Sequence, residues 1–255
     1  MLACALILVK SAAFEYTEMA KLFIVATPIG NLADISLRAI TVLSNADLIL
    51  AEDTRVTRTL LEHYNIKKEM LVYHQHSNPA TIRKIISLLR SGKNLALVSD
   101  AGTPGINDPG NFLIQEVLKE LPDLAVVPVP GANAAIAALS ISGFPTDRFT
   151  YLGFPPHKKG RQIFFKRIGE IEHAVVLYES KFRILKTLEA LALLGRPLVV
   201  CREITKQFET VYRLPVRQAG GTAEDIKMKL HDKNLLGEFV IVVGPKPRKI
   251  KNDEE

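Results

Sequence analysis

The stretch LALVSDAGTPGINDPG, residues 95–110, decides the fold that we expect for this chain. It opens with an apolar run at residues 95–99, which is typical of a strand buried on both faces of a sheet. A segment with helical spacing follows at residues 112–121, so residues 99–110 connect a strand to a helix. These twelve residues contain three glycines and two prolines. Connections of this length are uncommon outside functional loops, although a long structural turn is the alternative.

The same alternation of apolar runs and helical segments continues on both sides of this loop. Strands are expected at residues 22–27, 47–51, 71–73, 95–99 and 125–129. Helices are expected between and after them, at residues 35–43, 54–64, 78–90, 112–121 and 132–142. Short buried strands that alternate with helices predict a mostly parallel sheet with helices on both faces.

A turn-rich segment, GFPTDR at residues 143–148, separates this half from a second α/β segment. Its strands are expected at residues 174–178, 198–202, 210–214 and 239–243, and its helices at residues 162–170, 183–194 and 223–231. Thr222 and Asp225 form a capping box for the last helix. We therefore predict two α/β domains, residues 21–143 and 149–244. A loosely ordered N-terminal extension (residues 1–20) precedes them, and a charged tail (residues 245–255) follows.

The composition indicates a folded protein with a basic surface. Of 255 residues, 47% are hydrophobic and 24% are charged, which is enough to bury a large core. The net charge of +6 suits a polyanion such as RNA, although ordinary surface lysines explain it equally well. The two cysteines, Cys4 and Cys201, offer neither a zinc site nor a disulfide framework, so we expect a reducing compartment, the cytoplasm.

Several common signatures are absent from the sequence. The apolar run at residues 2–9 is too short to cross a bilayer, so residues 1–18 are at most a membrane-touching segment. No G-x-G-x-x-G follows the first strand, and no P-loop or H-E-x-x-H motif is present. His74 and His76 lack a third ligand in the sequence. We therefore expect neither a dinucleotide site nor a metal.

Three loops leave the carboxyl ends of the predicted parallel strands, the edge at which open α/β sheets bind ligands. They are residues 26–32, 99–110 and 128–133. Amide groups beside Gly102 and Thr103 suit a carboxylate, and Asp100 suits an amine or hydroxyl. Together they match the amino-acid end of S-adenosylmethionine. Taken alone, the first and third loops are better explained as plain turns, although Gly30 lets the backbone approach a ligand closely.

Seven segments carry a family resemblance when they are taken in chain order. They are TPIGNLADISLRA (27–39), AEDTR (51–55), LVSDAGTPGINDPG (97–110), VPVPGANAA (127–135), FPTDRF (144–149), YES (178–180) and REITKQFET (202–210). This set closely resembles the 16S ribosomal RNA cytidine 2′-O-ribose methyltransferases of the tetrapyrrole-methylase-like superfamily. The resemblance extends over residues 21–244. It departs at Lys181, where many relatives carry proline, and many relatives continue past the last strand with a helical domain.

The resemblance implies two α/β domains with S-adenosylmethionine bound in the cleft between them, a homodimer, and methylation of a cytidine ribose in the decoding region of 16S RNA. The cofactor contacts that it implies are Thr27, Pro28, Gly30, Asn31, Ser99, Asp100, Ala101, Gly102, Thr103, Pro104, Pro130, Gly131, Ala132, Glu179 and Ser180. Two other activities stay open. One is a tetrapyrrole (precorrin-type) C-methyltransferase, and the other is a non-catalytic RNA-binding assembly factor.

Methyl transfer to a ribose hydroxyl needs alignment of the two groups and a base for the hydroxyl proton, and it needs no metal. The candidates for the base are Glu52, Asp53, Glu203 and Lys206. Lys206 would require a lowered pKa, and Asp53 with Arg55 is equally well explained as a structural ion pair. For RNA contact we expect Lys158, Lys159, Arg161, Arg55 and Arg202, although a basic cluster is usually just a solvated surface.

Overall fold

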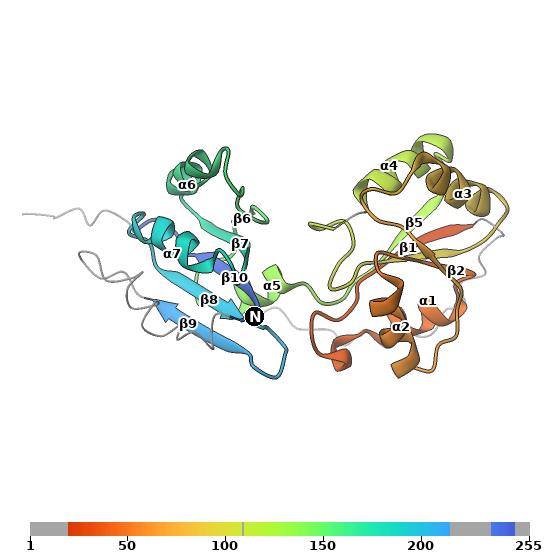
Figure 1. The fold of residues 1–255 in the computed structure, drawn as a ribbon, viewed down its shortest axis with the longest axis horizontal. Coiled ribbons are helices and arrows are strands. Elements are labelled where there is room, and N and C mark those ends of the chain that lie inside the picture. Colours follow the sequence, from red (N-terminus) through yellow and green to blue (C-terminus); the bar gives the residue numbers. More distant parts are fainter. Residues whose placement is uncertain (1–19, 109, 215–235, 248–255) are drawn as a thin grey trace, which may run out of the picture.

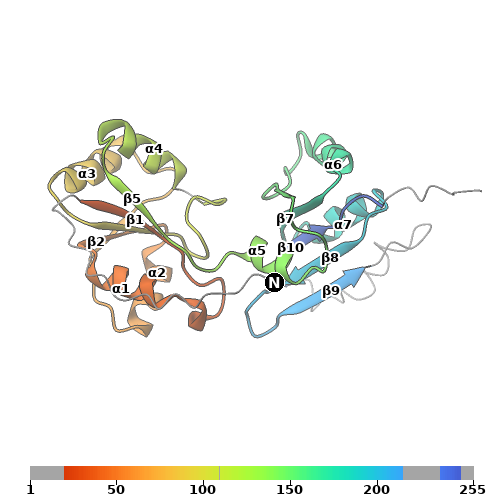
Figure 2. The ribbon, with the colours of Figure 1, turned by 180° about the vertical axis from the view of Figure 1, so that it is seen from behind.

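The computed structural model describes residues 20–108, 110–214 and 236–247. They form two five-stranded sheets, one from each half of the chain, and each sheet has helices on both faces (Figure 1 and Figure 2). The α/β fold expected from the sequence is therefore confirmed. Residues 1–19 of the expected extension, the expected helix at 223–231 and residues 248–255 of the tail lie outside the described residues.

The first sheet is wholly parallel and has the strand order β3-β2-β4-β1-β5. Its strands are β1 (Lys21–Val25), β2 (Leu48–Ala51), β3 (Met70–Val72), β4 (Leu95–Val98) and β5 (Ala125–Val129). Since all five run in the same direction, the loops that follow them emerge at one edge of the sheet. The predicted strands agree with these bounds to within two residues.

Helices cover both faces of the first sheet because its strands are apolar on both sides. The helices α1 (Leu37–Asn45) and α2 (Thr54–His63) pack on one face through residues such as Leu43 and Leu61. On the opposite face, α3 (Pro79–Arg90) and α4 (Asn111–Glu120) pack through residues such as Ile85 and Val117. Figure 1 shows the two pairs above and below the strands.

Helix starts follow local chemistry that is legible in the sequence. The side chain of Asn78 accepts the amide hydrogen of Thr81 at 2.9 Å, and Pro79 occupies the first helical position of α3. The Ser36 hydroxyl accepts from the amide of Ala39 at 3.0 Å at the start of α1. The start that we predicted for α3 is confirmed, whereas α1 begins two residues later than predicted, after its Ser36 cap.

The second sheet is mixed and has the order β6-β7-β10-β8-β9. Its strands are β6 (Phe149–Tyr151), β7 (Ala174–Ser180), β8 (Leu198–Arg202), β9 (Thr210–Leu214) and β10 (Glu238–Val243). Only β6 and β7 pair in parallel, and the other neighbours are antiparallel. The edge strand β6 was not predicted, because it follows a turn-rich segment and its three residues are too few to establish a strand pattern.

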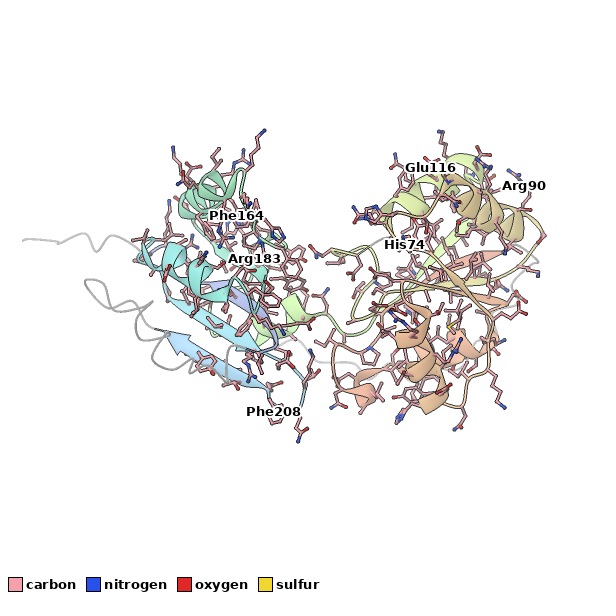
Figure 3. The ribbon with its side chains drawn as sticks, in the orientation of Figure 1. His74, Arg90, Glu116, Phe164, Arg183 and Phe208 are labelled. Carbon is pink, nitrogen blue, oxygen red and sulfur yellow. The ribbon has the colours of Figure 1, made fainter. Side chains whose placement is uncertain are left out.

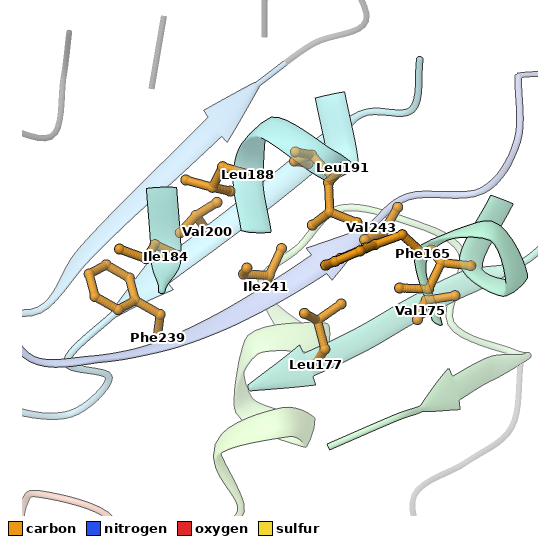
Figure 4. Packing of buried hydrophobic residues seen from close by; sticks show 12 residues of the cluster. Phe165, Val175, Leu177, Ile184, Leu188, Leu191, Val200, Phe239, Ile241 and Val243 are labelled. Carbon is orange, nitrogen blue, oxygen red and sulfur yellow. The ribbon is translucent and has the colours of Figure 1, made fainter. Parts of the chain in front are cut away.

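One face of the second sheet is covered by α6 (Arg161–Glu170) and α7 (Ile184–Ala192), whose apolar side chains meet those of the strands (Figure 4). The other face is covered by α5 (Ala134–Ser140), which packs through Ala135, Ala138 and Leu139 against β7, β8 and β10. The expected division at residues 143–149 groups α5 with the first half and stays a prediction. The packing of α5 favours a division just before Ala134.

Candidate functional site

A cavity of about 110 Å³ lies between the two halves, and both contribute to its wall. The first half supplies Ile29 and residues 101–103 and 106–108 of the glycine-rich loop. The second half supplies Tyr178 of β7, the turn after β8, and two residues of β10. The start of α5 completes the wall. Five predicted site residues line the cavity, namely Ala101, Gly102, Thr103, Glu203 and Lys206.

The glycine-rich loop is joined to the loop after β1 by paired backbone hydrogen bonds. The amide of Thr27 donates to the carbonyl of Gly102 at 2.8 Å, and the amide of Gly102 donates to the carbonyl of Thr27 at 3.1 Å. Gly102 has a φ of 84°, a backbone conformation that would strain any residue with a side chain. Thr27 therefore occupies this amide, and the binding of a carboxylate by amide groups beside Gly102 and Thr103 stays a prediction.

The third loop packs against the other two. The Thr103 hydroxyl donates to the carbonyl of Ala132 at 3.2 Å. A Cβ atom added at Gly131 would lie 2.9 Å from the Cβ of Ala26, closer than carbon atoms normally approach. The small residues at Gly131 and Ala132 therefore let the β5–α5 connection lie directly on the loop after β1. The structure brings the three predicted loops together as one unit.

The remaining predicted cofactor residues lie behind or beside this wall. Pro28 and Gly30 flank Ile29, and the side chain of Asn31 accepts the amide hydrogen of Ala33 at the start of a short 3₁₀ helix. Ser99 is buried, and Pro130, Gly131 and Ala132 precede Asn133, which lines the cavity and caps α5. Pro104 is buried in the loop. Asp100 accepts the amide hydrogen of Asp53 at 3.0 Å, so it joins the loops after β2 and β4.

The turn after β8 holds an unusual backbone on the opposite wall. Glu203 and Thr205 have φ values of 51° and 67°, in the left-handed region that non-glycine residues seldom adopt. The Nζ of Lys206 lies 3.0 Å from carboxylate oxygens of both Glu203 and Glu238. A Cβ atom added at Gly30 would collide with the Cγ of Lys206. This turn is therefore where the second half touches the loop after β1. Figure 3 shows Phe208 at the outer end of the β8–β9 connection.

The four predicted base candidates differ in how strongly their protons are held. Hydrogen bonds from Arg55 lower the pKa of Asp53 to about 2. Burial, the largest single influence, raises the pKa of Glu203, but hydrogen bonds from the Glu238 backbone and Lys206 outweigh it and the pKa is lowered. Burial likewise lowers the pKa of Lys206, but Glu238 and Glu203 outweigh it and the pKa is raised. The lowered pKa that Lys206 would need is therefore not found.

Burial raises the pKa of Glu52, and the charge of Asp100 adds to this effect. Glu52 is partly buried at the end of β2 and is not part of the cavity wall. Among the four predicted candidates, only Glu203 and Lys206 line the cavity, and these two neutralise each other. None of the four combines a place in the wall with a carboxylate free to accept a proton.

The sequence reasoning missed a group of residues in and beside the wall. Asn107 and Asp108 end the glycine-rich loop, and Tyr178 faces them from β7. A Cβ atom added at Gly153 would lie 2.6 Å from the Oδ1 of Asn107, so the chain after β6 touches this loop across the cavity. The Tyr151 and Tyr178 rings meet edge to face with centroids 5.3 Å apart. The sequence feature that could have pointed to these residues is the polar pair Asn107-Asp108, inside the loop at residues 99–110 that we already expected to be functional.

Glu179 occupies the centre of a buried network rather than the cavity wall. Its side chain is fully buried and lies 3.0 Å from Nη2 of Arg183, at the start of α7 (Figure 3). It also accepts from the Thr187 hydroxyl and the Ser180 amide. Because its oxygens are already engaged by the protein, this arrangement argues for a structural role and against the predicted cofactor contact of Glu179. Ser180 is partly buried and outside the wall.

The predicted RNA contacts divide into exposed and inward-facing side chains. Lys158, Lys159 and Arg55 are exposed, and Arg55 pairs with Asp53 at 2.6 Å. Arg202 is 7% exposed and donates to the carbonyls of residues 236 and 208, which argues against the predicted phosphate contact. Arg161 donates to the Thr187 hydroxyl and the Pro156 carbonyl, so it too is held inward. Among the five predicted contacts, Lys158 and Lys159 are the exposed side chains for which the described residues show no ion pair.

No group of three or more His, Cys, Asp or Glu side chains has the arrangement of a metal site within residues 20–108, 110–214 and 236–247. In the same described part of the chain, no helix has the length and apolar character needed to cross a bilayer.

The cavity wall combines carboxylates with apolar surface. Glu203 and Glu238 supply negative charge, and Lys206 offsets part of it. Ile29, Ile106, Ile204 and Val240 supply apolar surface to the same cavity. This mixture suits a ligand with cationic groups at one end and a flat ring at the other, as S-adenosylmethionine has. The residues present therefore fit that cofactor.

Comparison with known proteins gives consistent results. The sequence model described as "Tetrapyrrole (Corrin/Porphyrin) Methylases" matches residues 21–220. The chain is 45% identical to "Ribosomal RNA small subunit methyltransferase I" of Escherichia coli O157:H7, over 88% of this chain and 77% of that protein. It is 41% identical to the protein of the same name from Thermotoga maritima, over 89% of this chain and 100% of that protein.

Solved structures share the fold at lower identity. The cobalt precorrin-4 methyltransferase CbiF superposes with a TM-score of 0.63 at 19% identity, over 88% of this chain and 94% of that chain. A diphthine synthase superposes with a TM-score of 0.66 at 16% identity, over 89% of this chain and 90% of that chain. At these identities the likeness shows the fold alone.

Proposed function

This chain belongs to the family of ribosomal RNA small subunit methyltransferase I, within the tetrapyrrole methylases, and from this premise we propose that it methylates small-subunit ribosomal RNA with S-adenosylmethionine. The observation that carries the proposal is the cavity between the two sheets, whose wall contains six residues from the family-like segments SDAGTP and REITK. We further propose that the acceptor is the 2′-hydroxyl of a cytidine in the decoding region of 16S RNA, that the enzyme is a homodimer, and that it acts in the cytoplasm.

Ala101, Gly102, Thr103 and Asn133 would hold the cofactor on one side. The opposite side would be formed by Glu203, Ile204 and Lys206. S-adenosylmethionine supplies an activated methyl group on a positively charged sulfur. The protein's task is to align an acceptor oxygen with that methyl group and to exclude water. The apolar residues Ile29, Ile106 and Ile204 in the wall serve the second purpose.

The cavity must widen to accept this cofactor. Its 110 Å³ is smaller than the roughly 300–1,000 Å³ of most small-molecule sites. The contact between Gly30 and Lys206 is where the two walls meet, so we propose that they part there when the cofactor enters. The left-handed backbone of Glu203 and Thr205 beside this contact is the kind of strain that functional turns hold.

Two exposed lysines on the connection from β6 to α6 support an RNA substrate. Lys158 and Lys159 lie on the connection from β6 to α6. Near its start, Gly153 touches Asn107 of the cavity wall. Positive side chains on this connection would position a phosphate backbone without reading its sequence. A tetrapyrrole substrate, with several carboxylates, would also be attracted to lysines. An experiment must therefore decide between the two substrates.

The test supplies purified enzyme with methyl-labelled S-adenosylmethionine and one of two acceptors, unmodified small ribosomal subunits or a precorrin-type tetrapyrrole. We expect label only in the RNA, on a cytidine ribose found by mass mapping of nuclease fragments. Label in the tetrapyrrole would establish the C-methyltransferase alternative. Calorimetric titration with S-adenosylmethionine serves as a separate measurement, because a non-catalytic RNA-binding factor would show no binding.

A further inference from the structure

Asp108 is a carboxylate in the cavity wall that has no role in the proposed reaction as described above. It follows Asn107 at the end of the glycine-rich loop and is partly buried. Tyr178 lines the same cavity, and the charge of Asp108 acts on both Tyr151 and Tyr178. The Ser99 hydroxyl is its hydrogen-bonding partner from the end of β4. Among the described residues, no lysine or arginine forms an ion pair with it.

The other acids around the cavity are less suited to accept a proton. Asp53 is held by Arg55, and Glu203 and Glu238 share Lys206. Glu52 and Asp100 face Asp108 from the ends of β2 and β4, but neither lines the cavity. Asp108 is therefore the wall carboxylate that combines a place in the cavity with freedom from a cationic partner.

The surroundings of Asp108 place its proton affinity in the useful range. Burial raises the pKa of Asp108 to about 6, with a further rise from the charges of Glu52 and Asp100 against a lowering by Ser99. The hydroxyls of Tyr151 and Tyr178 stay neutral, because burial raises the pKa of each. A base is most effective when its pKa lies near the working pH, where it is ionised yet holds a proton well.

We propose that the Asp108 carboxylate is the catalytic base that accepts the proton of the acceptor ribose hydroxyl. This inference rests on the proposed function. As the O–H bond breaks, the proton passes to a carboxylate oxygen of Asp108. The ribose oxygen forms a bond to the methyl carbon of the sulfonium donor, and the electron pair of the breaking C–S bond stays on sulfur. Asp108 then releases its proton to water, so charge and atoms balance.

The test compares wild type with Asp108→Asn and Asp108→Glu on unmodified small subunits. We expect Asp108→Asn to lower kcat by at least about 100-fold, as loss of a general base does, and Asp108→Glu to restore part of it. In wild type, kcat should rise with pH up to about 6 and then level off, and this rise should be absent in Asp108→Asn. The matched control is Asp123→Asn, an exposed aspartate between α4 and β5, at the opposite edge of the first sheet.

Two further measurements need no turnover. The affinity for S-adenosylmethionine by calorimetry should change less than about threefold in Asp108→Asn. The melting temperature of this variant should exceed that of wild type at pH 8 and match it near pH 4. The reason is that ionisation of Asp108, whose pKa is raised in the folded state, costs stability as the pH increases through about 6.

Three results would overturn the assignment. They are a kcat of Asp108→Asn within threefold of wild type, a loss of cofactor affinity with kcat unchanged, or an unaltered pH profile. If Asp108→Asn does not fold, Asp108→Glu decides the matter by whether its pH profile shifts. Failure of the proposed function looks different, because wild type itself would then leave every ribose unmethylated.

Discussion

At the scale of single residues, Arg196 shows how much a buried charge can organise. Its side chain is 2% exposed and donates to the backbone carbonyls of Gly244, Ile168, Ile171 and His173 at 2.6–2.8 Å. These carbonyls come from the end of α6, from the residue just before β7 and from the residue just after β10, and the last two meet at one end of the second sheet. One guanidinium therefore donates to four backbone carbonyls, and its hydrogen bonds to Gly244 and Ile168 are fully buried.

We expect Arg196→Met to lower the free energy of unfolding by about 3 kcal/mol or more, since each buried carbonyl left without a donor costs about 1–3 kcal/mol. Urea denaturation followed by circular dichroism measures this change. Arg167→Met, at an exposed position on α6, is the matched control and should stay within about 0.5 kcal/mol of wild type. Equal losses in the two variants would contradict the role given to Arg196.

Residue roles were the hardest property to predict from the sequence. Glycine and proline marked the three loops correctly, because these residues have distinct backbone preferences. The roles of Arg202, Arg161 and Glu179 were misjudged or left open, because burial depends on which strands become neighbours. Asp108 was missed for the same reason, since its partners come from β4, β6 and β7.

At the scale of secondary-structure elements, the turn after β8 is strained. Thr205 is β-branched, has a φ of 67°, and its hydroxyl is buried without a hydrogen-bond partner. A β-branched residue in the left-handed region is disfavoured by about 1–2 kcal/mol. The strain is tolerated because Lys206, paired with Glu203 and Glu238, fixes the turn.

We expect Thr205→Gly to raise the melting temperature by about 2–4 °C, the shift that roughly 1 kcal/mol gives in a protein of this size. Thr210→Gly is the control, because Thr210 lies in β9 with ordinary strand geometry, where glycine should lower stability. Scanning calorimetry measures both variants. A loss of stability in Thr205→Gly comparable to that in Thr210→Gly would show that the turn holds no releasable strain.

Most elements could be predicted because their signals are local. The bounds of β5, β8 and β9 agree with the prediction at both ends, since apolar and β-branched residues between flanking turns mark them. The strand β6 and the pairing of α5 with the second sheet could not be predicted. The three residues of β6 carry no periodic pattern, and the small apolar side chains of α5 suit either sheet.

At the scale of the whole molecule, the positive side chains differ in how available they are to contact RNA. The net charge is +6, but the arginines predicted to bind RNA are largely engaged with the protein. Lys158 and Lys159 are exposed on the connection that passes the cavity. Lys158 and Lys159 are therefore better placed than the predicted arginines for the RNA contact that we propose.

We expect Lys158→Glu combined with Lys159→Glu to weaken RNA binding and to reduce the slope of log K against log salt by about 1–2, as loss of two phosphate contacts does. The control is Lys93→Glu combined with Lys119→Glu, exposed lysines at the amino-end edge of the first sheet. Filter binding over a range of salt concentrations measures both. An unchanged slope in the first variant would place the RNA elsewhere.

The connection from Pro130 to Asn133 carries the backbone from the first sheet to α5 on the second, and Asn133 is also part of the cavity wall. The connection between the two halves and part of the binding surface are thus one piece of chain. Any rotation of one half against the other must therefore change the shape of the cavity. A ligand that contacts both walls must resist that rotation. By thermodynamic reciprocity, tethering the halves in the bound geometry would tighten binding by the same factor with which the occupant favours that geometry.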